Sequence, residues 1–403
     1  MKHYAIPPFK ELLEHYPQIV EQLESQGFKK PTPIQHRAFE YALQKQDLLI
    51  QAPTGSGKTL IYALKILIEI LFNNELINQS NNDKSEHHSP THLIIAPNTV
   101  LVEQIFQMIM QVIPPQFSLN IITLKKKKVN IDEVDCLIST PKVLKEQLET
   151  FPQLLDNVQC LILDEADILL TKDFLTHLES IIEHLPENRQ DLLFSATYTK
   201  EMNQVAKEYL HEPKVIELPS LVEKSQISQL IYIVENNEKL SLLYHTLQHL
   251  KFGLLLIFVN RREHIKQVEE VVKSCGFEFK SISSQKSEFE RTRILQEFKE
   301  QKFDILIATD LISRGIDVPQ ISHIINYSIP QDHTKYVHRI GRATRHTNKG
   351  EVINFISKED VEKFKQVLQS YKIDYKTKQT PQLQELPKSI LKKIEGKVQH
   401  KKK

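Results

Sequence analysis

The stretch from Ala52 to Thr59, APTGSGKT, places two glycines, a lysine and a threonine in one short segment of a chain that has only 9 glycines among 403 residues. An apolar stretch, DLLIQ, precedes it and a helical pattern, TLIYALKIL, follows it. A glycine loop between a strand and a helix is the setting of a phosphate-binding Walker A motif. The glycines let backbone N–H groups turn toward phosphates, and the helix N-terminus adds its dipole. We expect ATP to be bound by this loop, through Thr54, Gly55, Ser56, Gly57, Lys58 and Thr59.

Within this loop, Lys58 is expected to reach the β- and γ-phosphates and Thr59 to hold Mg²⁺. A second segment, CLILDEAD, supplies carboxylates at the end of an apolar strand. Open α/β sheets bind ligands at this carboxyl edge. Asp164 is therefore predicted to position the Mg²⁺, and Glu165 to orient and deprotonate the attacking water.

The elements that position these residues follow a repeating pattern. Apolar runs of strand length, such as THLIIAP and DCLISTP, alternate with amphipathic segments, and the pattern recurs after about residue 227 with GLLLIFVN and FDILIATD. Such runs are typical of buried parallel strands with crossover helices. The predicted fold class is α/β, with two tandem domains that each contain a mostly parallel sheet flanked by helices. We place the first domain at residues 1–217, a linker at 218–226, the second domain at 227–375 and a basic, flexible tail at 376–403. The polar segment 73–92 is predicted to be a surface loop.

Composition excludes several protein classes. The chain has 40% hydrophobic and 26% charged residues, which is typical of a globular protein. Its apolar runs are shorter than the ~20 residues that cross a bilayer, and the N-terminal segment lacks a secretory pattern. Three cysteines without a CxxC pair indicate neither a disulfide framework nor a zinc site. We expect a cytoplasmic protein with no membrane partner. The tail has nine lysines and two glutamates, a charge that suits either solvent exposure or attraction to phosphate backbones.

The letters DEAD at residues 164–167, with APTGSGKT before them and SAT at 195–197 after them, resemble the DEAD-box ATP-dependent RNA helicases of superfamily 2. The resemblance covers nearly all of residues 9–370, and the bacterial single-core members are the most similar. It implies two RecA-like domains that close over ATP and RNA. The segment GFKKPTPIQ resembles the family's Q motif, so Gln35 is expected to recognise adenine and Phe28 to stack on it.

The resemblance extends to the second half of the chain. ATDLISRGIDV resembles motif V, which places Asp317 on the ATP ribose, and HRIGRATR resembles motif VI, in which Arg342 and Arg345 act as arginine fingers. The resemblance also implies that His338 and Arg339 couple the two domains through Ser195 and Thr197. Family positions that contact the RNA backbone are matched by Thr140, Arg291 and Thr309.

The departures from the family pattern cluster on RNA-facing or structural positions. Thr99 and Val100 replace an Arg and a Glu, Lys142 and Val143 replace Gly-Arg, and a Gly-Gly pair has no counterpart near Lys125–Lys128. The ATP-facing residues keep the family pattern. Loss of glycines removes close backbone approach to phosphates, and the four lysines could supply longer-range charge instead.

Three functions follow as hypotheses. The first is an ATP-dependent RNA helicase that acts on single-stranded RNA or short duplexes without sequence specificity, with ribosome assembly or messenger turnover as its setting. The second is an ATP-gated RNA clamp or ribosome-assembly factor that seldom unwinds RNA, which the altered RNA motifs favour. The third, a DNA helicase, is disfavoured by the Q motif and the DEAD spelling. A monomer is the expected state.

Overall fold

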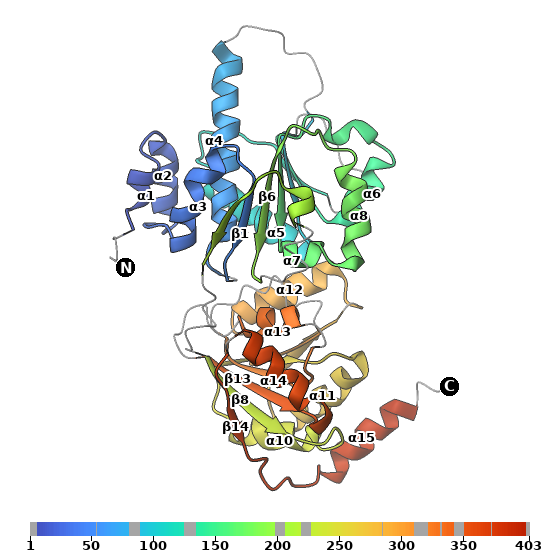
Figure 1. Ribbon diagram of the computed structural model, residues 1–403. Helices are drawn as coiled ribbons and strands as arrows, with labels where there is room; N and C mark the ends of the chain where they lie inside the picture. The colour runs from blue at the N-terminus through green and yellow to red at the C-terminus, as the bar shows by residue number, and fades with distance from the viewer. Residues whose placement is uncertain are drawn as a thin grey trace. The chain divides into compact units, whose positions relative to one another are not determined.

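The structure of the protein is a computed structural model that describes residues 6–53, 55–79, 89–124, 134–197, 206–218, 227–283, 285–309, 321–330, 333–341, 350–371 and 373–399. The chain divides into two compact units, Met1–Pro219 and Ser220–Lys403. Each unit holds one seven-stranded sheet in which every recorded strand pairing is parallel (Figure 1). The predicted fold class, two α/β domains with parallel sheets and flanking helices, is confirmed. The exact boundaries at 217, 227 and 375 stay predictions.

The first unit contains sixteen described elements. In chain order they are α1 (Phe9–Leu12), α2 (Pro17–Ser25), α3 (Pro33–Leu43), β1 (Leu48–Gln51), α4 (Lys58–Gln79), β2 (His92–Ile95), α5 (Thr99–Val112), β3 (Ile121–Thr123), β4 (Cys136–Ser139), α6 (Pro141–Leu148), the 3₁₀ helix η1 (Pro152–Leu155), β5 (Cys160–Asp164), α7 (Ala166–Leu169), α8 (Lys172–Ile182), β6 (Gln190–Ser195) and β7 (Lys214–Glu217).

The first sheet has the order β3-β4-β2-β5-β6-β1-β7. Alternate residues of its strands enter two separate cores, because side chains along a strand point to opposite faces. Leu48 and Ile50 pack into the core that includes α3, α4 and α5, whereas Leu49 packs into the core that includes α6, α7 and α8. The sheet is therefore covered on both faces, as the uninterrupted apolar strands predict.

The second unit contains the remaining elements. They are β8 (Ile227–Ile233), α10 (Lys239–His249), β9 (Leu254–Phe258), α11 (Arg262–Ser274), β10 (Phe279–Ile282), α12 (Glu288–Lys299), β11 (Ile305–Ala308), β12 (Ile321–Asn326), α13 (His333–Ile340), β13 (Gly350–Ile356), the 3₁₀ helix η4 (Lys358–Asp360), α14 (Val361–Ser370), β14 (Lys376–Lys378) and α15 (Lys388–Gln399). Among the described residues, no helix is both long and apolar enough to cross a membrane.

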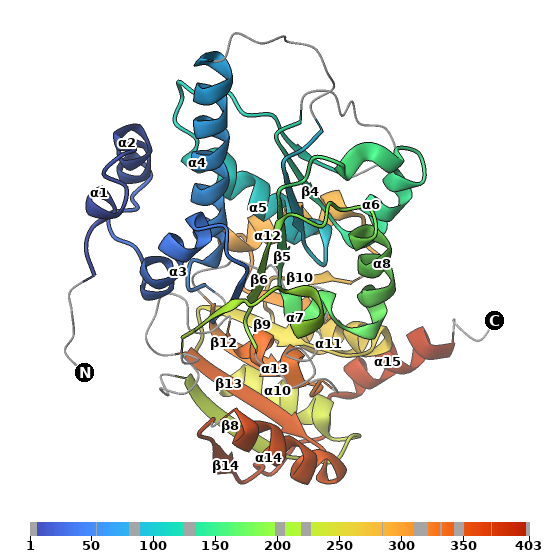
Figure 2. The same ribbon diagram turned by 45° about the horizontal axis from the view of Figure 1, so that its top comes forward.

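The two sheets repeat one topology. The second sheet has the order β10-β11-β9-β12-β13-β8-β14, so β8 occupies the place of β1, β12 that of β5 and β13 that of β6. In both units a helix follows the strand at this sixth place: α4 follows β1 in the first unit, and α10 follows β8 in the second (Figure 1 and Figure 2). The units are thus a structural repeat, although their sequences differ.

Part of the segment predicted as a loop at 73–92 has regular structure. Helix α4 continues to Gln79, and His92 already belongs to β2. Asparagine disfavours a helix by well under 1 kcal/mol, and a helix that has formed extends easily because only its first turn is costly. The asparagines of this segment therefore did not mark the helix end.

The prediction of a flexible tail at 376–403 is wrong for the residues that the structure describes there. Strand β14 pairs with β8, and α15 packs against α11. Leu386, Ile390 and Ile394 are buried in the core of the second unit. Ile390 and Ile394 lie four residues apart on one face of α15, and Leu386 precedes the helix. The many lysines obscured this pattern in the sequence.

Helix α15 therefore contributes to stability, and the Ile390→Ala variant tests this. Ile390 is 3% exposed, and its truncation is expected to lower the free energy of unfolding by about 2–4 kcal/mol. Leu391 is its neighbour on the same helix but is 37% exposed, so Leu391→Ala is the matched control, with an effect of about 0.5 kcal/mol or less. Urea unfolding measures both. Equal effects of the two substitutions would contradict the packing of α15.

Candidate functional site: the carboxyl edge of the first sheet

The residues predicted for ATP and, with Ser195, for interdomain coupling follow three adjacent strands of the first unit. The phosphate loop follows β1, Asp164 ends β5 and Ser195 ends β6, and the sheet order β5-β6-β1 makes these strands neighbours. All are parallel, so their carboxyl ends meet at one edge. Thr140 follows β4, which lies two places from β5 across β2. The predicted ATP residues and the predicted RNA residue Thr140 therefore lie at different places along this edge of the sheet.

The phosphate loop is shaped by its glycines and held by its own lysine. Gly55 and Gly57 have φ values of 80° and 91°, in the left-handed region that favours glycine. The buried Lys58 ammonium donates hydrogen bonds to the carbonyl oxygens of Ala52 at 2.6 Å and Pro53 at 3.2 Å. The described contacts of the lysine thus hold the loop that it is predicted to serve.

The Q motif is bound directly to this loop. Thr32 caps α3 and forms a capping box with Gln35, whose side-chain oxygen accepts a hydrogen bond from the Thr32 N–H at 2.8 Å. The Gln35 amide nitrogen donates to the Gly57 carbonyl at 2.9 Å, and the Thr32 hydroxyl donates to the Ser56 carbonyl at 2.7 Å. A Cβ atom on Gly57 would lie 2.2 Å from the Gln35 nitrogen, so a larger residue would displace the Gln35 side chain and would be strained at this φ. Phe28 is half-buried against the core beside them.

Asp164 lies buried beside the loop. Its two carboxylate oxygens accept hydrogen bonds from the Tyr62 hydroxyl at 2.8 Å and from the Glu165 backbone N–H at 2.9 Å. Burial, and secondly the neighbouring Glu165 charge, raise the pKa of Asp164 from 3.8 to about 6, while the Lys58 charge opposes the rise. Sequence analysis missed Tyr62, although its place one turn after Thr59 in α4 was a usable signal.

A pH prediction follows from the raised pKa of Asp164. Below about pH 6 the carboxyl group is protonated and loses the charge that would hold a cation, so ATP hydrolysis should fall as the pH is lowered through this value. Added Mg²⁺ competes with the proton and should move the midpoint to lower pH. Rate profiles at several Mg²⁺ concentrations measure this shift. A midpoint that does not respond to Mg²⁺ would show that Asp164 does not hold the metal.

Glu165 has an unusual backbone conformation. Its φ of 54° and ψ of 50° lie in the left-handed region, which costs a non-glycine residue roughly 1–2 kcal/mol. Strain of this kind is concentrated at functional positions. The side chain is buried, at 7% exposed, at the start of α7 and directly after the strand that carries Asp164. The backbone thus places a second carboxylate beside the first.

A hydrogen-bonded group joins the DEAD segment to β6. The Thr197 hydroxyl donates to the Asp167 carboxylate, the Thr197 N–H donates to the Ser195 hydroxyl at 3.1 Å, and that hydroxyl donates to the Thr197 carbonyl at 2.6 Å. The recorded partners of Ser195 and Thr197 therefore lie within the first unit. Their predicted coupling to His338 and Arg339 stays a prediction.

The residues present fit a nucleotide phosphate with a divalent cation. The loop offers the Lys58 ammonium, and the buried Ser56 hydroxyl has no hydrogen-bond partner among the described residues. Two buried carboxylates, Asp164 and Glu165, lie next to them, and oxygen ligands are those that Mg²⁺ prefers. Thr59 is half-exposed in the first turn of α4. The donors for an anion and the oxygens for a cation are thus in one place.

Arg339 has a structural environment that sequence analysis missed. It is fully buried in the second unit, where its guanidinium donates to the Asn260 side chain at 2.8 Å, to the Asn326 side chain at 3.0 Å and to the Ser328 carbonyl at 2.6 Å. The guanidinium also lies 4.7 Å from the Phe258 ring centroid. The side chain ties β9, β12 and α13 together within that unit. His338, its neighbour on α13, is also buried.

Two of the three predicted RNA residues directly follow strands, one in each unit, and the third lies in a helix. Thr140 is the N-cap residue of α6 and is 8% exposed, and Thr309 directly follows β11. Arg291 lies in α12 and donates to the Lys286 carbonyl at 3.1 Å. Among the departures, Val100 is buried in α5, whereas Lys142 is exposed in the first turn of α6.

Some predicted residues lie outside the part of the chain that the structure describes. They are Thr54, Asp317, Arg342, Arg345 and the Lys125–Lys128 run. Their assignments rest on the sequence alone and stay predictions.

Comparison with known proteins identifies the family of the chain. The family model described as DEAD/DEAH box helicase matches residues 32–205, and the model described as helicase conserved C-terminal domain matches residues 238–347. The ATP-dependent RNA helicase RhlB of Pseudomonas aeruginosa is 32% identical over 356 residues, which cover 85% of this chain and 88% of that protein. The ATP-dependent RNA helicase DbpA of Bacillus subtilis is 30% identical, over 84% of this chain and 70% of that protein.

Solved structures share the fold. Dbp5 of S. cerevisiae, bound to RNA and ADP BeF3, has a TM-score of 0.76 at 24% identity and covers 94% of this chain and 97% of its own. Mss116p, bound to ssRNA and AMP-PNP, has a TM-score of 0.79 at 22% identity and covers 98% of this chain and 83% of its own. At these identities the likeness establishes only the fold, two tandem RecA-like domains, whereas the family models and the sequence relatives establish the family. The chain belongs to the DEAD-box family of ATP-dependent RNA helicases.

Proposed function

We propose that the protein is an RNA-dependent ATPase that separates short RNA duplexes or remodels RNA–protein complexes. The observation that supports this most is the group of Lys58, Asp164 and Glu165, which are all buried at one sheet edge with Gln35 bonded to the same loop. A lysine for phosphates and two carboxylates for a cation and a water are the parts that phosphoryl transfer needs. Relatives that are 30% or more identical are named ATP-dependent RNA helicases.

In this proposal, ATP is bound through the phosphate loop, and Lys58 exchanges its bonds to the Ala52 and Pro53 carbonyls for phosphate oxygens. Gln35 exchanges its bond to Gly57 or Thr32 for the adenine edge. Mg²⁺, held by Thr59 and Asp164, would neutralise charge on the phosphates when bound. Glu165 orients the attacking water and accepts its proton. Asp317, Arg342 and Arg345 complete the site by resemblance to the family.

RNA is proposed to bind through its sugar–phosphate backbone at Thr140, Arg291 and Thr309. Backbone contacts carry no sequence information and make binding sensitive to salt. The proposed ligand is single-stranded RNA or a short duplex, with ribosomal RNA as a candidate, and the proposed state is a cytoplasmic monomer. ATP and RNA should each tighten the binding of the other, because such coupling is reciprocal.

A second function, an ATP-gated RNA clamp, is favoured by one observation. The first turn of α5 carries the buried Val100 and the short Thr99 where the family has charged residues. If the first unit makes fewer charged contacts with RNA, strand separation should be reduced more than RNA binding is.

Strand displacement from a short RNA duplex separates the two functions. The helicase proposal predicts displacement that needs ATP, falls with added salt and proceeds equally on unrelated sequences. A DNA duplex of the same sequence is the matched control and should be displaced far less, because 2′-hydroxyl contacts distinguish RNA. RNA binding that ATP strengthens, without displacement, would instead support the clamp. Equal displacement of DNA would contradict both.

A further inference from the structure

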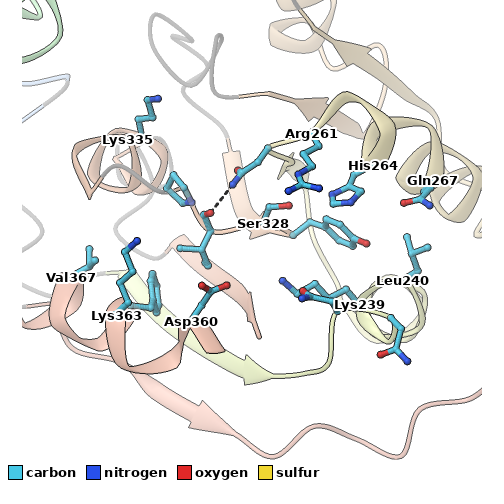
Figure 3. A pocket seen from close by; sticks show the side chains of 17 residues that line it. Lys239, Leu240, Arg261, His264, Gln267, Ser328, Lys335, Asp360, Lys363 and Val367 are labelled. Atoms are coloured by element: carbon cyan, nitrogen blue, oxygen red, sulfur yellow. Dashed lines mark hydrogen bonds between the residues drawn. The ribbon is translucent and has the colours of Figure 1, made fainter. Parts of the chain in front are cut away.

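The second unit has a cavity of about 910 Å³ at the carboxyl edge of its own sheet (Figure 3). The cavity is lined by residues that follow three strands: 260 and 261 after β9, 327–330 after β12, and 236 and 237 after β8. Parts of α10, α11, α13 and α14 complete the lining. Every lining residue belongs to this unit. The volume is within the ~300–1,000 Å³ range of small-molecule sites.

The cavity occupies the place that the phosphate loop has in the first unit. β8 corresponds to β1 in the shared strand order, and the helix that follows each strand begins with a lysine, Lys58 in α4 and Lys239 in α10. Both lysines are buried, at 7% and 8% exposed. The repeat therefore places a second buried lysine at an equivalent helix start.

Lys239 has no close counter-ion among the described residues. Its ammonium group has no hydrogen bond or ion pair with any described residue, although it lines the cavity. Burial lowers the pKa of Lys239, and the Asp360 carboxylate opposes this effect from a distance. The buried Nδ1 atom of His264, another lining residue, also has no partner in the described part of the chain. Buried polar groups normally have hydrogen-bond partners. A ligand in the cavity would supply partners for the Lys239 ammonium group and the His264 Nδ1 atom.

The charge of the cavity suits an anion. Arg261, Lys335 and Lys363 line it with Lys239, and Asp360 is the single lining carboxylate. Figure 3 shows Lys335 and Lys363 on one side and Arg261 and Lys239 on the other. The first turns of α10, α11, α13 and α14 also line it. Helix N-termini favour negative charge, and no described side chain caps α10, α11 or α14.

We propose that this cavity binds the phosphates of a nucleoside di- or triphosphate as a second, non-catalytic site. Apolar side chains of Leu240, Ile329 and Val367 line the remaining wall and would contact the nucleoside. Hydrolysis is not expected, because Asn326 stands where β5 carries Asp164. The Asn326 amide is engaged in hydrogen bonds with Asn354 and Arg339. The site binds and does not cleave.

Equilibrium dialysis of the full chain with radiolabelled ATP tests the proposal. The unaltered chain should show two classes of site, and Lys58→Ala should weaken the one in the first unit about 10- to 100-fold. In the Lys58→Ala chain, Lys239→Gln and, independently, the rim variant Lys363→Gln should each weaken the remaining binding about tenfold, as expected for a lost charge-assisted contact. Lys365→Gln is the matched control, since Lys365 lies on the same helix outside the cavity. Inorganic tripolyphosphate should compete.

Three results would overturn the proposal. They are a single class of site in the unaltered chain, residual binding that is indifferent to both Lys239→Gln and Lys363→Gln, and displacement of ATP from the remaining site by a short RNA, which would assign the cavity to an RNA backbone. Lys363 is exposed, so its variant should fold even if the buried Lys239→Gln variant does not. RNA-stimulated hydrolysis by the unaltered chain is measured separately, so failure here leaves the proposed function untouched.

Discussion

A Glu165→Gln chain is expected to bind ATP normally and to hydrolyse it about 100- to 10,000-fold more slowly, the range for loss of a general base. The amide keeps the size of the side chain but cannot accept the proton of the attacking water. Glu165 is buried, next to Asp164, in a left-handed backbone conformation that its neighbours maintain. Position and orientation should survive the substitution, so the loss should be confined to the chemical step.

Single-turnover hydrolysis and ATP binding together measure this effect. Glu183→Gln, an exposed change on the same unit, is the control and should leave both unchanged. Removal of the buried charge should also lower the pKa of Asp164, because the neighbouring carboxylate contributes to raising it. The pH below which the residual rate of ATP hydrolysis falls should then be lower than in the unaltered chain. A Glu165→Gln chain with near-normal turnover would assign the base to another residue.

Lys58→Ala is expected to weaken ATP binding about 10- to 100-fold, as for the loss of a strong charge-assisted hydrogen bond, and to abolish measurable turnover. The substitution removes the cation predicted for the phosphates. It also removes the donor that the Ala52 and Pro53 carbonyls have in this structure. We therefore expect a modest loss of stability in addition to the loss of binding.

Calorimetric titration with ATP measures the binding of Lys58→Ala, and thermal unfolding measures its stability. Lys58→Arg separates charge from shape, because a planar guanidinium cannot replace a compact ammonium in a narrow loop. It should fold with near-normal stability and still hydrolyse poorly. ATP affinity in Lys58→Ala equal to that of the unaltered chain at the first site would exclude the loop as the phosphate site.

Much of the ATP site follows from sequence because its residues are local. Gly55, Gly57 and Lys58 lie within four residues of one loop, and Asp164 and Glu165 are consecutive at the end of one strand, so motif spacing alone predicts their arrangement. The contacts of Tyr62 and Asp167 were not predicted. These contacts depend on which strands are adjacent in the sheet, and the order of strands cannot be predicted from any one segment of the sequence. Gln35 was predicted as an adenine contact, but its capping box and its bond to Gly57 are tertiary features.

In the second unit, too, tertiary contacts were not predicted from motifs or composition. Arg339 belongs to a motif that indicates coupling, yet its recorded hydrogen bonds join three elements of its own unit. Residues 376–403 were predicted as flexible because lysines dominate their composition. The few apolar residues decide their structure instead, since Ile390 and Ile394 are buried. Composition averages over a segment, whereas packing depends on which side of the chain each residue occupies.

Steady-state ATP hydrolysis by the purified chain, with and without RNA, tests the central claim most directly, beside Glu165→Gln as the inactive control. We predict a rate that rises markedly with RNA, loses this stimulation at high salt and disappears in the Glu165→Gln chain. Such a result would show that RNA binding is coupled to the ATP site despite the altered Thr99, Val100, Lys142 and Val143. Hydrolysis that ignores RNA of any sequence would contradict the account of an RNA-dependent ATPase.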